Sequence, residues 1–232
     1  MNRRILITGT TRGLGRFLAE HYLSQGDIVI GCGRSAVTIT HDNYVHHQLD
    51  VSSEPAVSGV FADIRRRFDG IDVLINNAGA ASMNAFALTP LALVRRVVET
   101  NFVGTAMLTH GAIRLLRRAS AGRIVNLTSI AVPLRLEGEA VYAASKSAIE
   151  TFTRILAREI GPMGITCNAV GPSVIRTQLT GGVPPEKLER LIQGQAVKRE
   201  ATAADVANVT DFFLRPESGL VTGQVVYLGG YG

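Results

Sequence analysis

Short apolar runs alternate with longer amphipathic stretches along the whole chain. The apolar runs are rich in Ile, Val and Leu and end at turn residues, which indicates buried strands; they lie at 5–8, 28–32, 44–49, 73–76, 123–127, 165–170 and 225–228. The stretches between them repeat apolar residues with helical spacing, and they predict helices at 13–25, 54–68, from 89 to beyond 101, 141–160, 186–193 and 203–214. Apolar strands that alternate with helices indicate a parallel sheet covered on both faces, a doubly wound α/β architecture.

Two of the predicted helices carry a recognisable start signal. Ser53 precedes the helix at 54–68 and is a favoured capping residue. Thr89-Pro90 predicts an N-cap followed by proline in the first helical position. No repeat, low-complexity tract or linker interrupts the pattern, so we expect a single domain over residues 1–232.

Membrane insertion and export are not expected for this chain. No uninterrupted apolar stretch reaches the length that spans a bilayer. The basic start at Arg3-Arg4 is followed by an apolar run of only Ile5–Ile7, which is too short for an export signal. We therefore expect a cytoplasmic protein without a membrane partner.

The chain carries a formal net charge of +5. Its basic clusters at 65–67 and 117–118 lie on predicted helices, where a solvated outer face explains them. No basic stripe with interleaved aromatic residues is present, so a nucleic-acid partner is not expected. A basic surface favours acidic partners, such as phosphate-bearing ligands or an acidic carrier protein.

No metal site is expected. Cys32 and Cys167 fall inside predicted buried strands, where reduced core cysteines are the usual interpretation. His46 and His47 are adjacent in a predicted strand, so their side chains point to opposite faces and cannot form a ligand pair.

A glycine-rich loop stands between the first predicted strand and the first predicted helix. It reads Thr8-Gly9-Thr10-Thr11-Arg12-Gly13-Leu14-Gly15. Glycines let the backbone approach a ligand closely, and a helix N-terminus offers N–H groups to a pyrophosphate. The spacing differs from the general dinucleotide fingerprint, but the position within a βαβ unit favours a nucleotide site.

The end of the second strand selects between NAD and NADP. An NAD site has a carboxylate there for the ribose 2′-hydroxyl, whereas this chain has Gly33 followed by Arg34. A guanidinium pairs with a 2′-phosphate through two parallel hydrogen bonds. Arg12 in the glycine loop is a second candidate for the same phosphate, so NADP(H) is favoured over NAD.

These residues resemble the short-chain dehydrogenase/reductase family, in its classical form, over essentially the whole chain. Tyr142 follows Ser129 by thirteen residues and precedes Lys146 by four. The matching segments are Thr8–Gly15, Leu49–Val51, Asn76–Gly79, Asn101, Ser129, Tyr142–Lys146, Asn168–Pro172 and Thr177. The resemblance implies a single Rossmann domain with seven parallel strands in the order 3-2-1-4-5-6-7. In that order Cys32 and Cys167 lie four strands apart, too far for a disulfide.

The resemblance also implies cofactor contacts along the cleft. The residues expected to bind NADP(H) are Gly9, Thr11, Arg12, Gly13, Leu14, Gly15, Arg34, Asp50, Val51, Asn77, Ala78, Gly79, Tyr142, Lys146, Pro172, Val174 and Thr177. Asp50 and Val51 flank the adenine in this interpretation, and the segment from Pro172 to Thr177 holds the nicotinamide carboxamide.

The catalytic residues expected from the resemblance are Asn101, Ser129, Tyr142 and Lys146. Tyr142 and Lys146 share one helix face, one turn apart. A nearby ammonium favours the phenolate, so we expect a lowered pKa for Tyr142, which then exchanges protons as general acid or base. Ser129 hydrogen-bonds the carbonyl oxygen, and Asn101 holds a water that links Lys146 to solvent.

The substrate is less defined by the sequence. It depends on the loop at 130–141 and on a lid near 177–195; the first contains Arg135, Glu137 and Glu139, which we interpret as solvated rim charges. The closest likeness is to 3-oxoacyl carrier-protein reductases, which favours a 3-oxoacyl thioester or polyketide-like ketone, although Met163 stands where those enzymes often have a docking arginine. The alternatives are an oxidative dehydrogenase of a secondary alcohol, steroid or sugar, and a catalytically silent NADP-binding regulator. The family also implies a homotetramer or homodimer.

Overall fold

A single parallel sheet organises the computed structural model, which describes residues 2–36, 39–176 and 183–231. Its seven strands follow the order β3-β2-β1-β4-β5-β6-β7, as the family resemblance implies. All neighbouring strands pair in parallel. The strands are β1 (Arg4–Thr8), β2 (Ile28–Gly33), β3 (Tyr44–Gln48), β4 (Val73–Asn76), β5 (Gly122–Leu127), β6 (Ile165–Gly171) and β7 (Val225–Tyr227).

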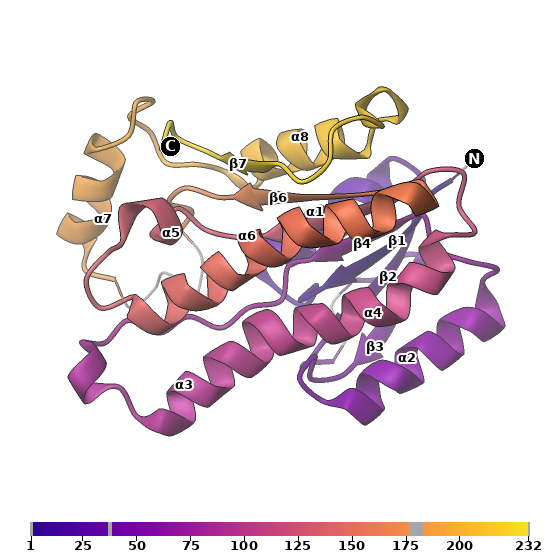
Figure 1. Cartoon of the computed structure of the whole chain (residues 1–232), viewed down its shortest axis with the longest axis horizontal. Coiled ribbons are helices and arrows are strands. Elements are labelled where there is room, and N and C mark those ends of the chain that lie inside the picture. Colours follow the sequence, from indigo (N-terminus) through magenta and orange to yellow (C-terminus); the bar gives the residue numbers. More distant parts are fainter. Residues whose placement is uncertain (1, 37–38, 177–182, 232) are drawn as a thin grey trace.

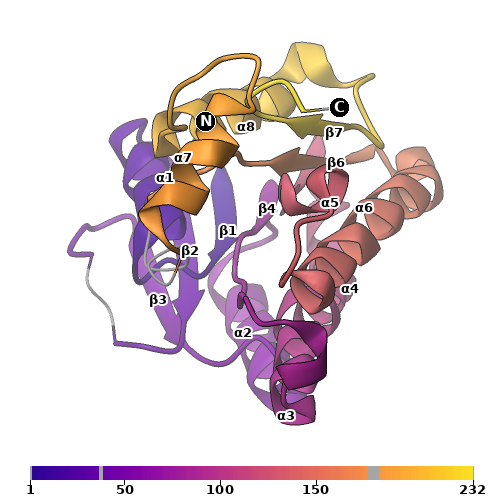
Figure 2. The same cartoon turned by 90° about the vertical axis from the view of Figure 1, so that its left-hand side faces the viewer.

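Helices cover both faces of this sheet (Figures 1 and 2). The helices are α1 (Gly13–Ser24), α2 (Glu54–Arg67), α3 (Leu91–Val98), α4 (Gly104–Leu116), α5 (Ala131–Leu134), α6 (Ala140–Ile160), α7 (Pro185–Gln193) and α8 (Ala203–Leu214). Helices α2, α4 and α6 lie on one face, and α1 and α8 lie on the other. The short α5 and α7 pack together at one end of the molecule through a third apolar cluster.

Alternation along each strand divides the core into two layers. Leu6, Leu74 and Ile124 belong to the cluster that packs against α2, α4 and α6. Their neighbours Ile5 and Ile75 belong to the cluster against α1 and α8. Successive side chains of a strand point to opposite faces, so strands that are apolar at every position are needed to fill both layers.

The two predicted helix starts differ in detail from the structure. Ser53 is the N-cap residue of α2, but its side chain makes no capping hydrogen bond. Pro90, not Thr89, is the N-cap of α3. The Thr89 hydroxyl donates instead to the carbonyl oxygen of Ala85, because the preceding chain forms a 3-10 turn at Phe86–Leu88.

The long helix predicted from residue 89 onward is interrupted by a π-helical segment, Glu99–Val103, between α3 and α4. Asn101 lies buried in this segment. A π-helical turn inside an α-helix is rare and frequently marks a functional site.

Neither cysteine is bonded to another. Cys32 and Cys167 are both free and buried, on β2 and β6, which are four positions apart in the sheet. Among the described residues, no group of three or more His, Cys, Asp or Glu side chains is arranged to hold a metal ion. None of the helices in the described ranges combines the length with the apolar composition that a bilayer crossing requires.

Candidate active site

The backbone of the glycine loop after β1 lies very close to the end of β2 and to the first turn of α1. Gly9 adopts φ +75°, a left-handed conformation that favours glycine, and its N–H donates to the carbonyl oxygen of Cys32 at 2.7 Å. A Cβ on Gly15 would stand 2.2 Å from the carbonyl oxygen of Gly9. The first turn of α1 therefore lies directly against the loop, and its N–H groups face the space that an anionic ligand would occupy.

Thr8 and Asn77 fasten the ends of the two central strands together. The Thr8 hydroxyl accepts hydrogen bonds from the backbone N–H groups of Asn77 at 2.9 Å and Ala78 at 2.8 Å. The Asn77 side-chain amide donates to the Thr8 carbonyl at 2.8 Å. These bonds fix the Asn76–Gly79 segment beside the glycine loop.

A cavity of about 720 Å³ extends from this loop along the carboxyl ends of the strands. Its volume is within the range of small-molecule and cofactor sites. Almost the whole predicted cofactor set lines it: Gly9, Thr11, Arg12, Gly13, Leu14, Gly15, Arg34, Asp50, Val51, Asn77, Ala78, Gly79, Tyr142, Lys146 and Pro172. A cleft of this size with a glycine cradle and a helix N-terminus fits a nicotinamide dinucleotide.

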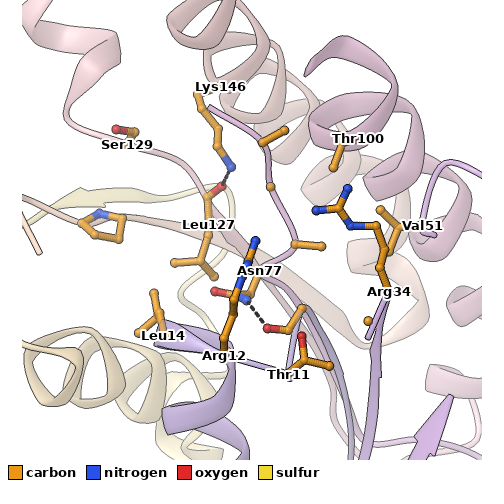
Figure 3. Close-up of a pocket in the computed structure, with 18 of the residues that line it drawn as sticks. Thr11, Arg12, Leu14, Arg34, Val51, Asn77, Thr100, Leu127, Ser129 and Lys146 are labelled. Carbon is orange, nitrogen blue, oxygen red and sulfur yellow. Dashed lines mark hydrogen bonds between the residues drawn. The ribbon is translucent and has the colours of Figure 1, made fainter. Parts of the chain in front are cut away.

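Two arginines extend into the cavity from different elements, Arg12 from the start of α1 and Arg34 from the end of β2 (Figure 3). Both are exposed, so their guanidinium groups can rearrange around a ligand. Gly33 lines the cavity beside them, where an NAD site has its carboxylate. This part of the cleft has the positive charge that a phosphate requires.

Asp50 is held in its ionised form near these arginines. The backbone N–H and the hydroxyl of Ser52 donate to its Oδ1 at 3.0 Å and 2.7 Å. The hydrogen bond from the Ser52 N–H lowers the pKa of Asp50 most, burial opposes it, and Arg34 lowers it further. The carboxylate is therefore an acceptor over the neutral range.

Of the predicted cofactor residues, one does not line the cavity and one lies outside the described residues. Val174 is buried in the apolar cluster with Ile130 and Ile192, so its side chain supports α7 and does not line the cavity. The neighbouring Ser173 and Ile175 line it instead. Thr177 lies outside the described residues, as does the first part of the predicted lid at 177–195.

The other end of the cavity contains Ser129, Tyr142 and Lys146. Helix α6 places Tyr142 and Lys146 on one face, and the Lys146 ammonium lies 6.0 Å from the centre of the Tyr142 ring. Lys146 Nζ donates to the carbonyl oxygen of Leu127 at 2.7 Å (Figure 3). The structure thus brings together a hydroxyl, a phenol and an ammonium at the end of a nucleotide-sized cleft.

Burial dominates the ionisation of this pair. It raises the pKa of Tyr142 to about 12, with a smaller rise from the Glu139 carboxylate, while a hydrogen bond with Ser129 acts in the opposite direction. Burial lowers the pKa of Lys146 to about 8. The expected lowering of the Tyr142 pKa is therefore wrong for this structure, because desolvation raises the pKa while the Lys146 ammonium donates its hydrogen bond to Leu127.

Asn101 organises the neighbourhood of Lys146 from the π-helical segment. Its Oδ1 accepts from the Ala80 N–H at 2.7 Å, and its Nδ2 donates to the Ala80 carbonyl and the Ser145 hydroxyl, both at 2.9 Å. Ser145 in turn donates to the Tyr142 carbonyl at 2.7 Å. Asn101 therefore ties the segment after β4 to α6, and its predicted water-holding role stays a prediction.

Glu139 is not the solvated rim charge that the sequence suggested. Its side chain is buried, with a relative exposure of 9 %. Burial raises the pKa of its carboxyl, and Lys187 on α7 opposes that rise. The polar residues around it gave no signal of burial, because the chain next to it comes from residues distant in sequence, such as Asn84, whose N–H donates to the Gly138 carbonyl.

Sequence reasoning also missed several lining residues. They are Ser35, Leu49, Ala80, Thr100, Leu127 and Thr128; Ser173 and Ile175 also line the cavity, and they fall within the predicted segment from Pro172 to Thr177. Most of them directly follow a strand or neighbour a predicted site residue. Because the carboxyl ends of parallel strands meet at one edge, this position was the signal that could have found them.

The fold and the cleft together define an oxidoreductase with a nicotinamide dinucleotide cofactor. A family model described as enoyl-(acyl carrier protein) reductase matches residues 9–231. The 3-oxoacyl-[acyl-carrier-protein] reductase of Aquifex aeolicus is 30 % identical over 235 aligned positions, covering 97 % of this chain and 95 % of the relative. The chain belongs to the short-chain dehydrogenase/reductase family.

Two solved structures show the same similarity in three dimensions. Ligand-free aldohexose dehydrogenase of Thermoplasma acidophilum superposes with a TM-score of 0.88 at 27 % identity, covering 99 % of this chain and 94 % of the other. A single-residue variant of actinorhodin polyketide ketoreductase with NADPH gives 0.87 at 27 % identity, covering 99 % and 96 %. The relatives thus include enzymes named for acyl, sugar and polyketide substrates.

Proposed function

We propose that this chain reduces a ketone to a secondary alcohol with NADPH, and that the ketone is a 3-oxoacyl thioester or a polyketide-like compound. The observation that carries the proposal is the juxtaposition in one cleft of Tyr142, Ser129 and Lys146 at one end with Arg12 and Arg34 toward the other. The similarity to a 3-oxoacyl-[acyl-carrier-protein] reductase and to a polyketide ketoreductase supports the substrate class.

The residues that would hold the cofactor follow from the cleft. The glycine loop and the start of α1 would bind the pyrophosphate, Arg12 and Arg34 the 2′-phosphate, and Lys146 the nicotinamide ribose. The chemistry that bound NADPH supplies is hydride donation to the carbonyl carbon.

The proton chemistry belongs to Tyr142. Because its pKa is raised, Tyr142 keeps its proton at neutral pH, which is the form that an acid needs. It would donate this proton to the carbonyl oxygen as negative charge develops there, while Ser129 donates a hydrogen bond to the same oxygen. Lys146, held by Leu127, would stabilise the phenolate that results.

The direct test follows NADPH absorbance with a short 3-oxoacyl thioester, simple ketones and quinones. We expect the wild type to reduce the thioester and Tyr142→Phe to lose about 10²–10⁴-fold in kcat without losing NADPH binding. Tyr22→Phe is the matched control, since Tyr22 is a buried tyrosine in the core on the α1 side of the sheet. A wild type that binds NADPH but reduces nothing would overturn the reductase proposal.

The same assay also tests the alternative function, oxidation of a secondary alcohol or sugar. The similarity to an aldohexose dehydrogenase is the observation that favours it. Aldohexoses and secondary alcohols with NADP⁺ would therefore be assayed in parallel. Faster turnover of a sugar than of any thioester would replace the substrate class but leave the roles of Tyr142 and Lys146 in place.

The proposal includes a homo-oligomer, either dimer or tetramer. An apolar groove along α6 contains Phe102, Phe152 and Ile155, and Ile155 is 54 % exposed. An exposed apolar groove on a helix pair is typical of a subunit interface. Light scattering of the wild type and Ile155→Glu tests this, and a monomeric wild type would contradict it.

A further inference from the structure

A buried carboxylate lies on the catalytic helix one turn beyond Lys146. The Glu150 side chain is only 6 % exposed. Its Oε1 accepts hydrogen bonds from the Thr128 hydroxyl at 2.8 Å and the Tyr227 hydroxyl at 2.5 Å. A buried charge is costly unless hydrogen bonds compensate it. The proposed reaction assigns no role to this buried carboxylate.

The ion pair at this position does not explain the burial. Arg154 Nη1 lies 3.8 Å from Glu150 Oε2, and the arginine side chain is 54 % exposed. Exposed pairs of this kind contribute little, because solvent screens them. The two hydroxyl donors are therefore the partners that matter.

Thr128 connects Glu150 to the reacting groups. It stands between Leu127, whose carbonyl oxygen binds the Lys146 ammonium, and Ser129, which faces the substrate cleft. Its N–H donates to the Val170 carbonyl at 2.8 Å. With its hydroxyl held by Glu150, this residue is fixed from both the sheet and α6.

Tyr227 connects the same carboxylate to the edge of the sheet. It is the last residue of β7 and pairs with Gly171 of β6. A Cβ on Gly171 would stand 2.3 Å from the Tyr227 ring and 3.2 Å from the Thr128 side chain. The ring therefore packs directly on the backbone that leads into Pro172, another residue of the cleft.

Tyr227 stays a donor in this arrangement over the working pH range. Burial raises the pKa of its phenol above the ordinary value of 10, and the hydrogen bond to the Glu150 carboxylate raises it further. Both hydroxyls can then donate to a single carboxylate oxygen without competition from ionisation.

We propose that Glu150 is a positioning residue which, through Thr128 and Tyr227, holds the carboxyl ends of β5, β6 and β7 in register with Lys146. This inference rests on the proposed reductase function of the same cleft. A shift of about 1 Å in a catalytic group can cost about a hundredfold in rate, so the position of the segment 127–129 matters to the proton transfer.

The test compares three replacements, two at Glu150 and one at its exposed partner. Glu150→Gln keeps an oxygen that accepts from both hydroxyls, and we expect kcat to stay within about threefold of wild type. Glu150→Leu removes the acceptor, and we expect kcat to fall about tenfold to a hundredfold. Arg154→Leu removes only the exposed cation and should leave kcat unchanged.

A double-mutant cycle separates positioning from simple stabilisation. If Glu150 acts through the Tyr227 hydroxyl, Tyr227→Phe lowers kcat, and adding it to Glu150→Leu costs little more. A purely structural role lowers the melting temperature but leaves kcat and its pH profile at wild-type values. That outcome in folded Glu150→Leu, or a failure of Glu150→Gln to rescue kcat, would overturn the proposal.

NADPH affinity provides the readout that is independent of turnover. If Leu127 moves, Lys146 loses its hydrogen-bond acceptor, and we expect Glu150→Leu to weaken NADPH binding severalfold while Glu150→Gln does not. An inactive wild type would refute the proposed reductase function, and the kcat values could then not be compared. The NADPH affinities would still test the positioning role of Glu150, because equal affinity in wild type and Glu150→Leu would refute that role.

Discussion

The Lys146 ammonium on α6 donates a hydrogen bond of 2.7 Å to the carbonyl oxygen of Leu127, the last residue of β5. The lysine is almost fully buried, at 5 % relative exposure. Burial lowers its pKa to about 8. The protonated form therefore predominates below about pH 8, and the neutral form predominates above it.

This ionisation predicts how cofactor binding depends on pH. A protonated Lys146 attracts the anionic dinucleotide, so NADPH affinity should be highest at neutral pH and should fall as the pH rises through about 8. Titration of cofactor fluorescence over neutral and alkaline pH measures it. Lys146→Met should bind NADPH more weakly and show no decline in this range; the same decline in that variant would assign it to another group.

Glu139 is expected to contribute to the raised pKa of Tyr142. Its carboxylate disfavours the phenolate and contributes to the raised pKa of Tyr142. Glu139→Gln removes the negative charge, so the pKa of Tyr142 should fall. Alcohol oxidation requires the deprotonated phenol, and its pH profile in kcat should therefore move to lower pH. Glu137→Gln, at an exposed position nearer to α5 in the same loop, is the control, and an identical profile for Glu139→Gln and wild type would refute the coupling.

Cofactor preference should respond to the charge at position 34. Arg34→Asp removes a phosphate partner and adds a carboxylate, so NADPH affinity should fall about tenfold to a hundredfold, as expected for a lost ion pair, and NADH should become the better cofactor. Kinetics with both cofactors measure this, with Arg117→Asp at the end of α4 as the charge control. Unchanged preference in Arg34→Asp would disprove the 2′-phosphate assignment.

The sequence predicted the sheet well because most of its strands contain runs of consecutive apolar residues, a pattern typical of a parallel sheet buried on both faces. The cleft was also predictable, since its residues follow the strands in order. Glu139 and Glu150 were not, because their surroundings include residues that are distant along the chain, Lys187 near Glu139 and Tyr227 bonded to Glu150. Local patterns carry no information about such long-range contacts.

Helix capping is a second feature that the sequence predicts only in part. Both Ser53 and Thr202 are suitable N-cap residues by type. In the structure Thr202 forms a complete capping box with Asp205, whereas the Ser53 side chain makes no capping bond. Residue type predicts where a helix starts, but side-chain rotation decides whether the cap bond forms.

Replacing Ser53 or Thr202 by alanine should show whether the side chain of each residue caps its helix. The Asp205 N–H donates to the Thr202 hydroxyl at 3.2 Å, and Asp205 Oδ2 accepts from the Thr202 N–H at 2.7 Å. Thr202→Ala breaks this box and should lower the free energy of unfolding by about 1 kcal/mol. Ser53→Ala removes no cap bond and should cost less than half as much. Urea unfolding of both variants measures the difference, and equal losses would mean that Ser53 caps α2 in solution.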